Sequence, residues 1–208
     1  MSIPVHPDVG GAGEDRAMVH QLLVPPQEIR TDRLLLTPLS PRDVDDVHGL
    51  FADARTWTHL PAGRHRSRAQ TVDLVQRKIG GRARYGLGSW TVRSLADRGF
   101  LGVAGVDMTA GHVWNLGYRF VPGSWGHGYA TEAARAAVAA AAGAAPDVPV
   151  TGRVLTNNTG SAVVLRRAGL SLVWQGTTAA ATPAGVERQV WADRALTAEQ
   201  HDWLVAHA

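Results

Sequence analysis

The sequence predicts an α/β (α+β) fold, with a mixed, mostly antiparallel sheet of six to seven strands and helices on both faces. One observation is the order of the expected elements, which runs strand, two helices, three strands, helix, strand, helix and two strands. A second is that the three central strands are joined by short links, which is typical of an antiparallel meander. A third is size: 208 residues, 45% of them hydrophobic, suffice for one domain with a substantial core.

The N-terminal half predicts a leader, a strand and two helices. Residues 1–28 mix Gly, Pro and charges without periodicity, so we expect a mobile leader, with the domain spanning 29–193. The apolar run "RLLLTPL" at 33–39 reads as a strand. Ser40 as N-cap and Pro41 at the first helical position then predict a helix start, and a second helix is expected over 67–84.

The remaining elements follow from apolar runs separated by turn residues. The meander comprises "SWTVRSL", "FLGVAGVDM" and "HVWNLGYRFV", and an alanine-rich helix follows until Gly143 and Pro146. Strand "VPVTGRVL" precedes a helix that Asn158 caps and Gly169 ends. Strands "LSLVWQG" and "VERQVWAD" complete the sheet, and residues 194–208 are expected to form a short helical tail.

Composition excludes several function classes. Without cysteine, the chain has no disulfide, cysteine nucleophile or thiolate metal site, and no metal is expected. No run of about 18 apolar residues predicts a membrane span, and no signal peptide is evident, so we predict a cytoplasmic protein without membrane partners. The net charge is +3 and the arginines are scattered, which argues against nucleic acid as a partner.

Three glycines at 123, 126 and 128 stand between a strand and the alanine-rich helix. Unpaired amides and the positive end of the helix dipole make such a place a site for phosphate or pyrophosphate. A P-loop would need Lys and Ser or Thr after Gly128, where Tyr129 and Ala130 stand instead. A dinucleotide fingerprint would need Gly or Ala at 131, where this chain has Thr131, and a parallel unit before it.

Two motifs, "GYRFVPGSWGHGYATEA" and "NNTGSAVVLRRAGL", together resemble the GNAT superfamily of acyl-CoA-dependent N-acyltransferases, in particular its ribosomal-protein N-terminal acetyltransferase branch. The resemblance covers about 29–193 and implies the GNAT fold, with a splay between the two central strands. It also implies acetyl-CoA as cosubstrate, its pantetheine arm against Phe120, Val121 and Asn158. The residues implied to hold its pyrophosphate are Trp125, Gly126, His127, Gly128, Tyr129, Ala130 and Thr131.

The same resemblance implies catalytic roles. The backbone N–H of Arg119 is expected to stabilise the oxyanion, and Ser161 to supply the proton for the leaving thiolate. Asn115 stands where many relatives carry a glutamate base, and an amide cannot accept a proton. It is expected to hold a water or the substrate, with Asp107 or His112 as remoter relays.

The missing base points to an acceptor whose amine is easily deprotonated. An α-amine with a pKa of about 7.8 is about 10% neutral at pH 7, whereas a lysine amine with a pKa of about 10.4 is about 0.04% neutral. The sequence therefore predicts an N-acetyltransferase acting on a small-molecule or peptide amine, with a protein N-terminus as one candidate. Trp57 and Trp90 are candidate substrate contacts, with His59, Arg64 and Trp114 near them.

Two other functions stay open on the sequence alone. The chain could be a non-catalytic acyl-CoA-binding sensor or interaction module with a GNAT fold, because Asn115 replaces the base and no tyrosine follows Ser161. It could also bind a nucleotide phosphate at the glycine cluster. The sequence does not decide between a monomer and a homodimer.

Overall fold

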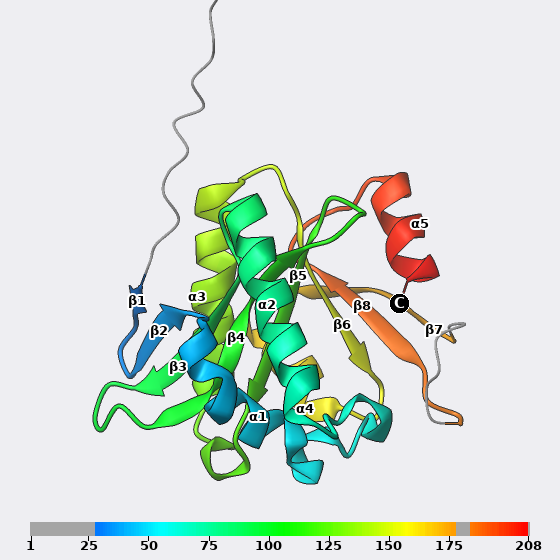
Figure 1. Cartoon of the computed structure of the whole chain (residues 1–208). Coiled ribbons are helices and arrows are strands. Elements are labelled where there is room, and N and C mark those ends of the chain that lie inside the picture. Colours follow the sequence, from blue (N-terminus) through cyan, green and yellow to red (C-terminus); the bar gives the residue numbers. More distant parts are fainter. Residues whose placement is uncertain (1–27, 178–183, 208) are drawn as a thin grey trace, which may run out of the picture.

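One continuous sheet of eight strands organises the chain in the computed structural model, which describes residues 28–177 and 184–207 (Figure 1). The strand order is β1-β2-β3-β4-β5-β6-β8-β7, and all neighbours pair antiparallel except β5 and β6. The strands are β1 (Ile29–Arg30), β2 (Leu34–Pro38), β3 (Ser89–Ser94), β4 (Phe100–Met108), β5 (Trp114–Phe120), β6 (Val150–Leu155), β7 (Ser171–Gly176) and β8 (Arg188–Ala192).

The predicted fold class is confirmed, with one strand more than expected. The additional strand is β1, in which Ile29 and Arg30 pair with Leu36 and Leu35. Two residues carry too little alternation to be recognised as a strand in the sequence. The predicted leader lies outside the described residues, except for Glu28.

Helix starts agree with the capping signals in the sequence. The α-helices are α1 (Val44–Ala52), α2 (Arg68–Tyr85), α3 (Tyr129–Ala144), α4 (Thr159–Arg167) and α5 (Ala198–Ala206). Ser40 and Asp43 form a capping box around a 3₁₀ turn that leads into α1, and Ser67 with Gln70 forms another at α2. Asn158 caps α4 by accepting a hydrogen bond from the Ser161 N–H at 3.2 Å.

The helices cover opposite faces of the sheet. Four alanines of α3 and Leu165 of α4 pack with Trp114 and Leu116 in the larger core cluster. Val47 of α1 and Val75 of α2 form a second cluster with Leu39 on the other face. Successive strand residues face opposite sides, so Leu116, Tyr118 and Phe120 face α3 and α4, whereas Gly117 and Arg119 face α1 and α2.

The parallel neighbours β5 and β6 separate after a short contact. Only Trp114 with Val150 and Asn115 with Thr151 are paired, although both strands continue for several residues. Thr151 secures this junction by donating its hydroxyl to the Trp114 carbonyl at 2.9 Å. Beyond it the two strands diverge visibly (Figure 1), which is the splay that the family resemblance implies.

The segment after β8 packs onto the sheet through α5. Leu204 is fully buried against Val113 and Val190. Thr197 starts the helix with a capping box, and the His207 N–H bonds back to Trp203 at its end. Among the described residues, no helix combines the length and apolar character that a membrane crossing requires.

Candidate active site

A cavity of about 590 Å³ occupies the splay between β5 and β6. Its walls come from both strands, from α4, from the start of α3 and from the loop that follows α1. A space of this size is typical of small-molecule sites. Many sequence-predicted residues line it: Arg119, Phe120, Trp125, Gly126, Gly128, Tyr129, Ala130, Thr131, Asn158 and Ser161. Val121, His127, Asn115, Trp57 and Trp90 do not line it.

The glycine loop presents bare backbone at one end of the cavity. Gly126 and Gly128 both adopt φ of +80°, a left-handed conformation that residues with a Cβ rarely accept. Gly128 is the N-cap of α3 and offers no side chain, so no side chain caps the first amides of this 16-residue helix. Those amides and the positive helix end are available to an anion.

Arg33 of the loop before β2 holds the glycine loop against α3. Its Nη1 donates to the His127 carbonyl at 2.9 Å, and its Nη2 lies 2.6 Å from the Glu132 carboxylate. Thr31 also donates to Glu132, at 2.6 Å. Burial alone would raise the pKa of Glu132, but the hydrogen bonds from Thr31 and Arg33 outweigh it and lower the pKa. Glu132 therefore remains a carboxylate that anchors the loop.

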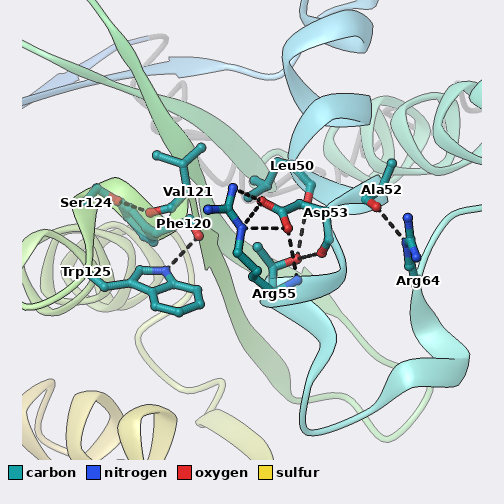
Figure 2. Close-up of polar contacts among 10 residues, drawn as sticks. Leu50, Ala52, Asp53, Arg55, Arg64, Phe120, Val121, Ser124 and Trp125 are labelled. Carbon is teal, nitrogen blue, oxygen red and sulfur yellow. Dashed lines mark hydrogen bonds and ion pairs between the residues drawn. The ribbon is translucent and has the colours of Figure 1, made fainter.

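Hydrogen bonds at the end of β5 shape the loop entrance (Figure 2). The Trp125 indole donates to the Phe120 carbonyl at 2.9 Å, and the Ser124 hydroxyl donates to the Val121 carbonyl at 2.8 Å. The Trp125 side chain is half exposed and lines the cavity. Phe120 thus has its carbonyl occupied, and a ligand in the gap would meet its N–H.

The backbone register decides which amides face the gap. The Val121 N–H donates to the Leu101 carbonyl of β4 at 2.9 Å. Hydrogen-bonded pairs recur at every second residue of an antiparallel ladder, so Arg119, paired with Val103, also points its N–H to β4. The prediction of Arg119 N–H as the oxyanion donor is therefore wrong. The alternation instead directs the N–H groups of Tyr118 and Phe120 toward the gap.

Two hydroxyl residues meet on the α4 side of the cavity. The Tyr118 hydroxyl donates to the Ser161 carbonyl at 2.9 Å. Burial raises the pKa of Tyr118, and a hydrogen bond with the Ser161 side chain only partly offsets this. Tyr118 is thus a protonated phenol beside Ser161 at neutral pH. Tyr118 belongs to the motif "GYRFVPGSWGHGYATEA". Alternation of side chains along this strand would have placed it on the same face as Phe120.

The opposite side of the cavity is cationic and aromatic. The Arg119 guanidinium lies 3.4 Å from the Trp57 ring centroid and donates to the Thr56 carbonyl. Burial lowers the pKa of Arg119 to about 10, so it stays charged at neutral pH. His59 also lines this side, and burial together with the charge of Arg119 lowers its pKa below 6.5. Its imidazole is therefore neutral at pH 7.

The prediction of Trp90 as a substrate contact is wrong. Trp90 is fully buried in the larger core cluster, because its side chain faces α3. Trp114 is also buried there, at 1% exposure. Trp57 is 8% exposed and lies behind Arg119, so it positions that side chain instead of facing the cavity. Arg64 turns away and donates to the Ala52 carbonyl at 2.6 Å (Figure 2).

Of the residues considered for proton relay, Asn115 and Asp107 are held by other partners. The Asn115 side-chain oxygen accepts from Arg153 Nε at 3.3 Å, just at the junction of β5 and β6. Asp107 forms an ion pair with Lys78 of α2. His112 lies in the turn between β4 and β5 with φ of 53°. Among the described residues, no three His, Cys, Asp or Glu side chains are grouped as a metal site.

Comparisons with known proteins agree with this geometry. Residues 33–171 match the acetyltransferase (GNAT) domain family. The uncharacterized protein YkkB of Bacillus subtilis is 32% identical over 110 residues, which cover 51% of this chain and 63% of YkkB. The chain thus aligns with less than two thirds of that relative's length.

Solved structures share the fold. An acetyltransferase from Agrobacterium tumefaciens has a TM-score of 0.67 at 24% identity, over 81% of this chain and 94% of that one. RimL, a ribosomal L7/L12 alpha-N-protein acetyltransferase solved with coenzyme A, has a TM-score of 0.66 at 18% identity, over 78% and 96%. The family match covers more than half of the chain, from β2 to the start of β7. The chain belongs to the GNAT acetyltransferase family.

Proposed function

We propose that the protein transfers an acetyl group from acetyl-CoA to a primary amine by direct attack in a ternary complex. One observation carries the proposal: a cavity lies in the splay between β5 and β6, with the uncapped start of α3 at one end. That arrangement offers, along a single path, a site for the pyrophosphate, a site for the extended pantetheine arm and a reaction centre.

The cosubstrate side uses mostly backbone. The amides of Gly126, Gly128 and the first turn of α3 would bind the pyrophosphate. The N–H groups of Phe120 and Tyr118 would bind the pantetheine arm and the thioester oxygen, since β6 has diverged and leaves these donors without a strand neighbour. Asn158 would approach the arm from the α4 side, while its side-chain oxygen caps the helix.

The proton transfers would involve side chains on opposite walls. His59, neutral at pH 7, is the candidate base for the acceptor amine, directly or through one water. Asn115 and Arg153 are connected by a hydrogen bond and would order a water deeper in the site. The pair Ser161 and Tyr118 would supply the proton to the leaving thiolate, which needs only a modest donor because a thiol has an ordinary pKa of about 8.5.

The acceptor in this proposal is an amine of low pKa, such as an α-amine. His59 with a lowered pKa is a weak base, so an acceptor that is already partly neutral is favoured. RimL, which shares the fold, is described as an alpha-N-protein acetyltransferase, and this likeness supports the same class of acceptor here.

Two measurements test the proposal. Acetyl-CoA should raise the melting temperature whereas ATP and NAD do not, and a thiol-release assay should detect turnover with α-amines faster than with lysine side chains. Binding of acetyl-CoA without turnover of any amine would favour the sensor function instead. Stabilisation by ATP or NAD alone would favour a nucleotide site.

The proposed proton donors can be tested by removing each hydroxyl. Tyr118→Phe should lower kcat about 10-fold, because general acid catalysis by a placed group is worth about 10² or more and Ser161 would retain part of it. Ser161→Ala should lower kcat by a similar factor. The double variant should lower kcat by less than the product of the two single-variant factors. Fully multiplicative losses would show that the two hydroxyls do not act as one unit.

A further inference from the structure

Three arginines from three adjacent strands line the same side of the cavity: Arg119 of β5, Arg153 of β6 and Arg188 of β8. We call them the arginine wall. Arg188 is directly opposite Leu155 in the β6–β8 ladder, and Arg153 is two residues from Leu155, so both face the same side. Asn115, whose side chain meets Arg153, is two and four residues from Gly117 and Arg119, which places Arg119 on this side too.

No carboxylate neutralises the wall within residues 28–177 and 184–207. Arg119 donates to the Thr56 carbonyl, and Arg153 to the His207 carbonyl and Asn115. Arg188 Nε is buried without a hydrogen-bond partner among these residues. None of the residues that line the cavity is Asp or Glu. Among the described residues, the hydrogen-bond partners of the wall are therefore all neutral groups.

Two other arginines near the cavity are neutralised by a carboxylate, whereas Arg167 of α4, which also lines it, forms no ion pair among the described residues. Arg55, also part of the lining, lies 2.7 Å from the Asp53 carboxylate (Figure 2). Arg33 at the glycine loop has Glu132 at 2.6 Å. The chain thus supplies a carboxylate at these two places and none at the wall, which indicates that the compensating anion comes from outside.

Burial disfavours the charged form of each arginine in the wall. Burial lowers the pKa of all three arginines, and the charge of Arg188 lowers that of Arg153 further. A buried arginine that finds only neutral partners is unfavourable, whereas a carboxylate or phosphate would satisfy two donors at once. An anion held by the wall would offset this penalty.

The wall is separate from the proposed cosubstrate site. Arg119, Arg153 and Arg188 lie on the sheet face that α1, α2 and α5 cover, with Arg153 next to His207, while Tyr118, Phe120 and the start of α3 belong to the other face. His59, the candidate base, lies on the same side as the wall, and the charge of Arg119 reaches its imidazole. An anion on the wall is therefore close to where the acceptor amine would lose its proton.

We propose that the acceptor is a primary amine that also bears a carboxylate or phosphate, and that the arginine wall binds this anionic group. The inference rests on the proposed transfer to an amine and names the acceptor's chemical class. Free amino acids, phosphorylated amines and acidic peptide N-termini share this chemistry. The walls of the cavity are built to orient such a molecule by its charge, with the amine toward His59.

The test is a thiol-release assay on matched acceptor pairs. The anionic members are L-aspartate, L-phenylalanine, O-phosphoethanolamine and the peptide amide Ser-Glu-Glu, and the neutral partners are L-aspartic diamide, L-phenylalanine amide, ethanolamine and Ser-Gln-Gln amide. At least one anionic member should have kcat/KM about 10-fold or more above that of its neutral partner. A carboxylate raises the pKa of a neighbouring amine and so works against this preference, which makes the comparison a strict one. The preferred pair distinguishes free amino acid, phosphate and peptide as the source.

Variants then connect the preference to the wall. Arg153→Met and Arg188→Met keep the hydrocarbon stem and should each raise KM for the anionic acceptor about 10-fold or more, with Arg153→Lys and Arg188→Lys restoring part of it. Acetyl-CoA affinity, measured by calorimetry, should stay within about 2-fold. Arg98→Met, in the exposed turn between β3 and β4, serves as the control.

The outcomes separate the two proposals. Neutral partners used as well as anionic ones, or unchanged KM in both Met variants, would overturn the anionic acceptor while leaving amine acetylation in place. A loss of acetyl-CoA affinity in these variants would assign the wall to the cosubstrate and also overturn it. Failure of every amine, with or without charge, would instead count against the transferase itself.

Discussion

The two sides of the splay offer different kinds of chemical group to the ligands that we propose. On the α3 and α4 side the binding groups are backbone amides, two glycines with φ of +80° and a pair of hydroxyls. On the α1 and α2 side they are charged and aromatic side chains, among them Arg119, Arg153 and His59. Backbone recognition is tied to a local conformation and leaves a sequence motif, whereas side-chain recognition is assembled from distant strands and leaves none.

A substitution in the glycine loop should have the largest effect on ligand affinity. Gly126→Asp should weaken acetyl-CoA about 100-fold, because a positive φ strained by a Cβ costs about 1–3 kcal/mol and the carboxylate repels a pyrophosphate. Calorimetry measures the affinity. Gly126→Ala separates strain from charge, and Gly123→Asp, whose glycine is outside the lining, should leave binding nearly unchanged. Normal affinity in Gly126→Asp would remove the loop from the cosubstrate site.

On the α1 and α2 side, the proposed role of His59 is tested by the pH dependence of activity. A base must be neutral, and since the pKa of His59 is lowered below 6.5, activity should fall only as the pH drops below that value. His59→Gln should lower kcat/KM about 30-fold near pH 7 and remove this acid limb, within the range for general base catalysis. His201→Gln on α5, outside the cavity lining, is the control. An acid limb that persists in His59→Gln would exclude this base.

The smallest effect is expected where the glycine loop meets its support, at Arg33. Arg33→Met should weaken acetyl-CoA about 3-fold, since a partly exposed ion pair and its hydrogen bond to the loop are worth about 0.5–1 kcal/mol. Arg30→Met, which loses only the exposed pair with Glu28, should not. The measurement is again calorimetry, and equal affinities in both variants would show that Arg33 does not order the loop.

The same variant has a consequence at acid pH. The pKa of Glu132 is lowered from 4.5 in the folded protein, so its contribution to stability is present above that value and is lost as the pH falls through the lowered pKa. Without Arg33 the pKa of Glu132 should rise, and acid unfolding should begin at a higher pH. Melting curves between about pH 3 and 6 would detect this shift.

Features set by local sequence were predictable, whereas features assembled from distant strands were not. Capping residues such as Ser40, Ser67 and Asn158 act within a few residues, so helix starts were predictable, as was the glycine loop. Which backbone amides face the gap was not predictable, because whether Arg119 or Tyr118 points its N–H there depends on the register of β4 against β5. Trp90 was misassigned since local sequence does not say which face of a sheet a strand residue takes.

The position of β8 and α5 has a consequence for how acceptor choice is encoded along the chain. The family match ends at residue 171, yet Arg188 of β8 and the His207 carbonyl that holds Arg153 come after it. The segment 184–207 therefore supplies part of the arginine wall without lining the glycine loop. Under the proposal that the wall binds the acceptor, this segment would carry part of the acceptor specificity, and exchanging it between related proteins would change acceptor preference while the glycine loop stays intact.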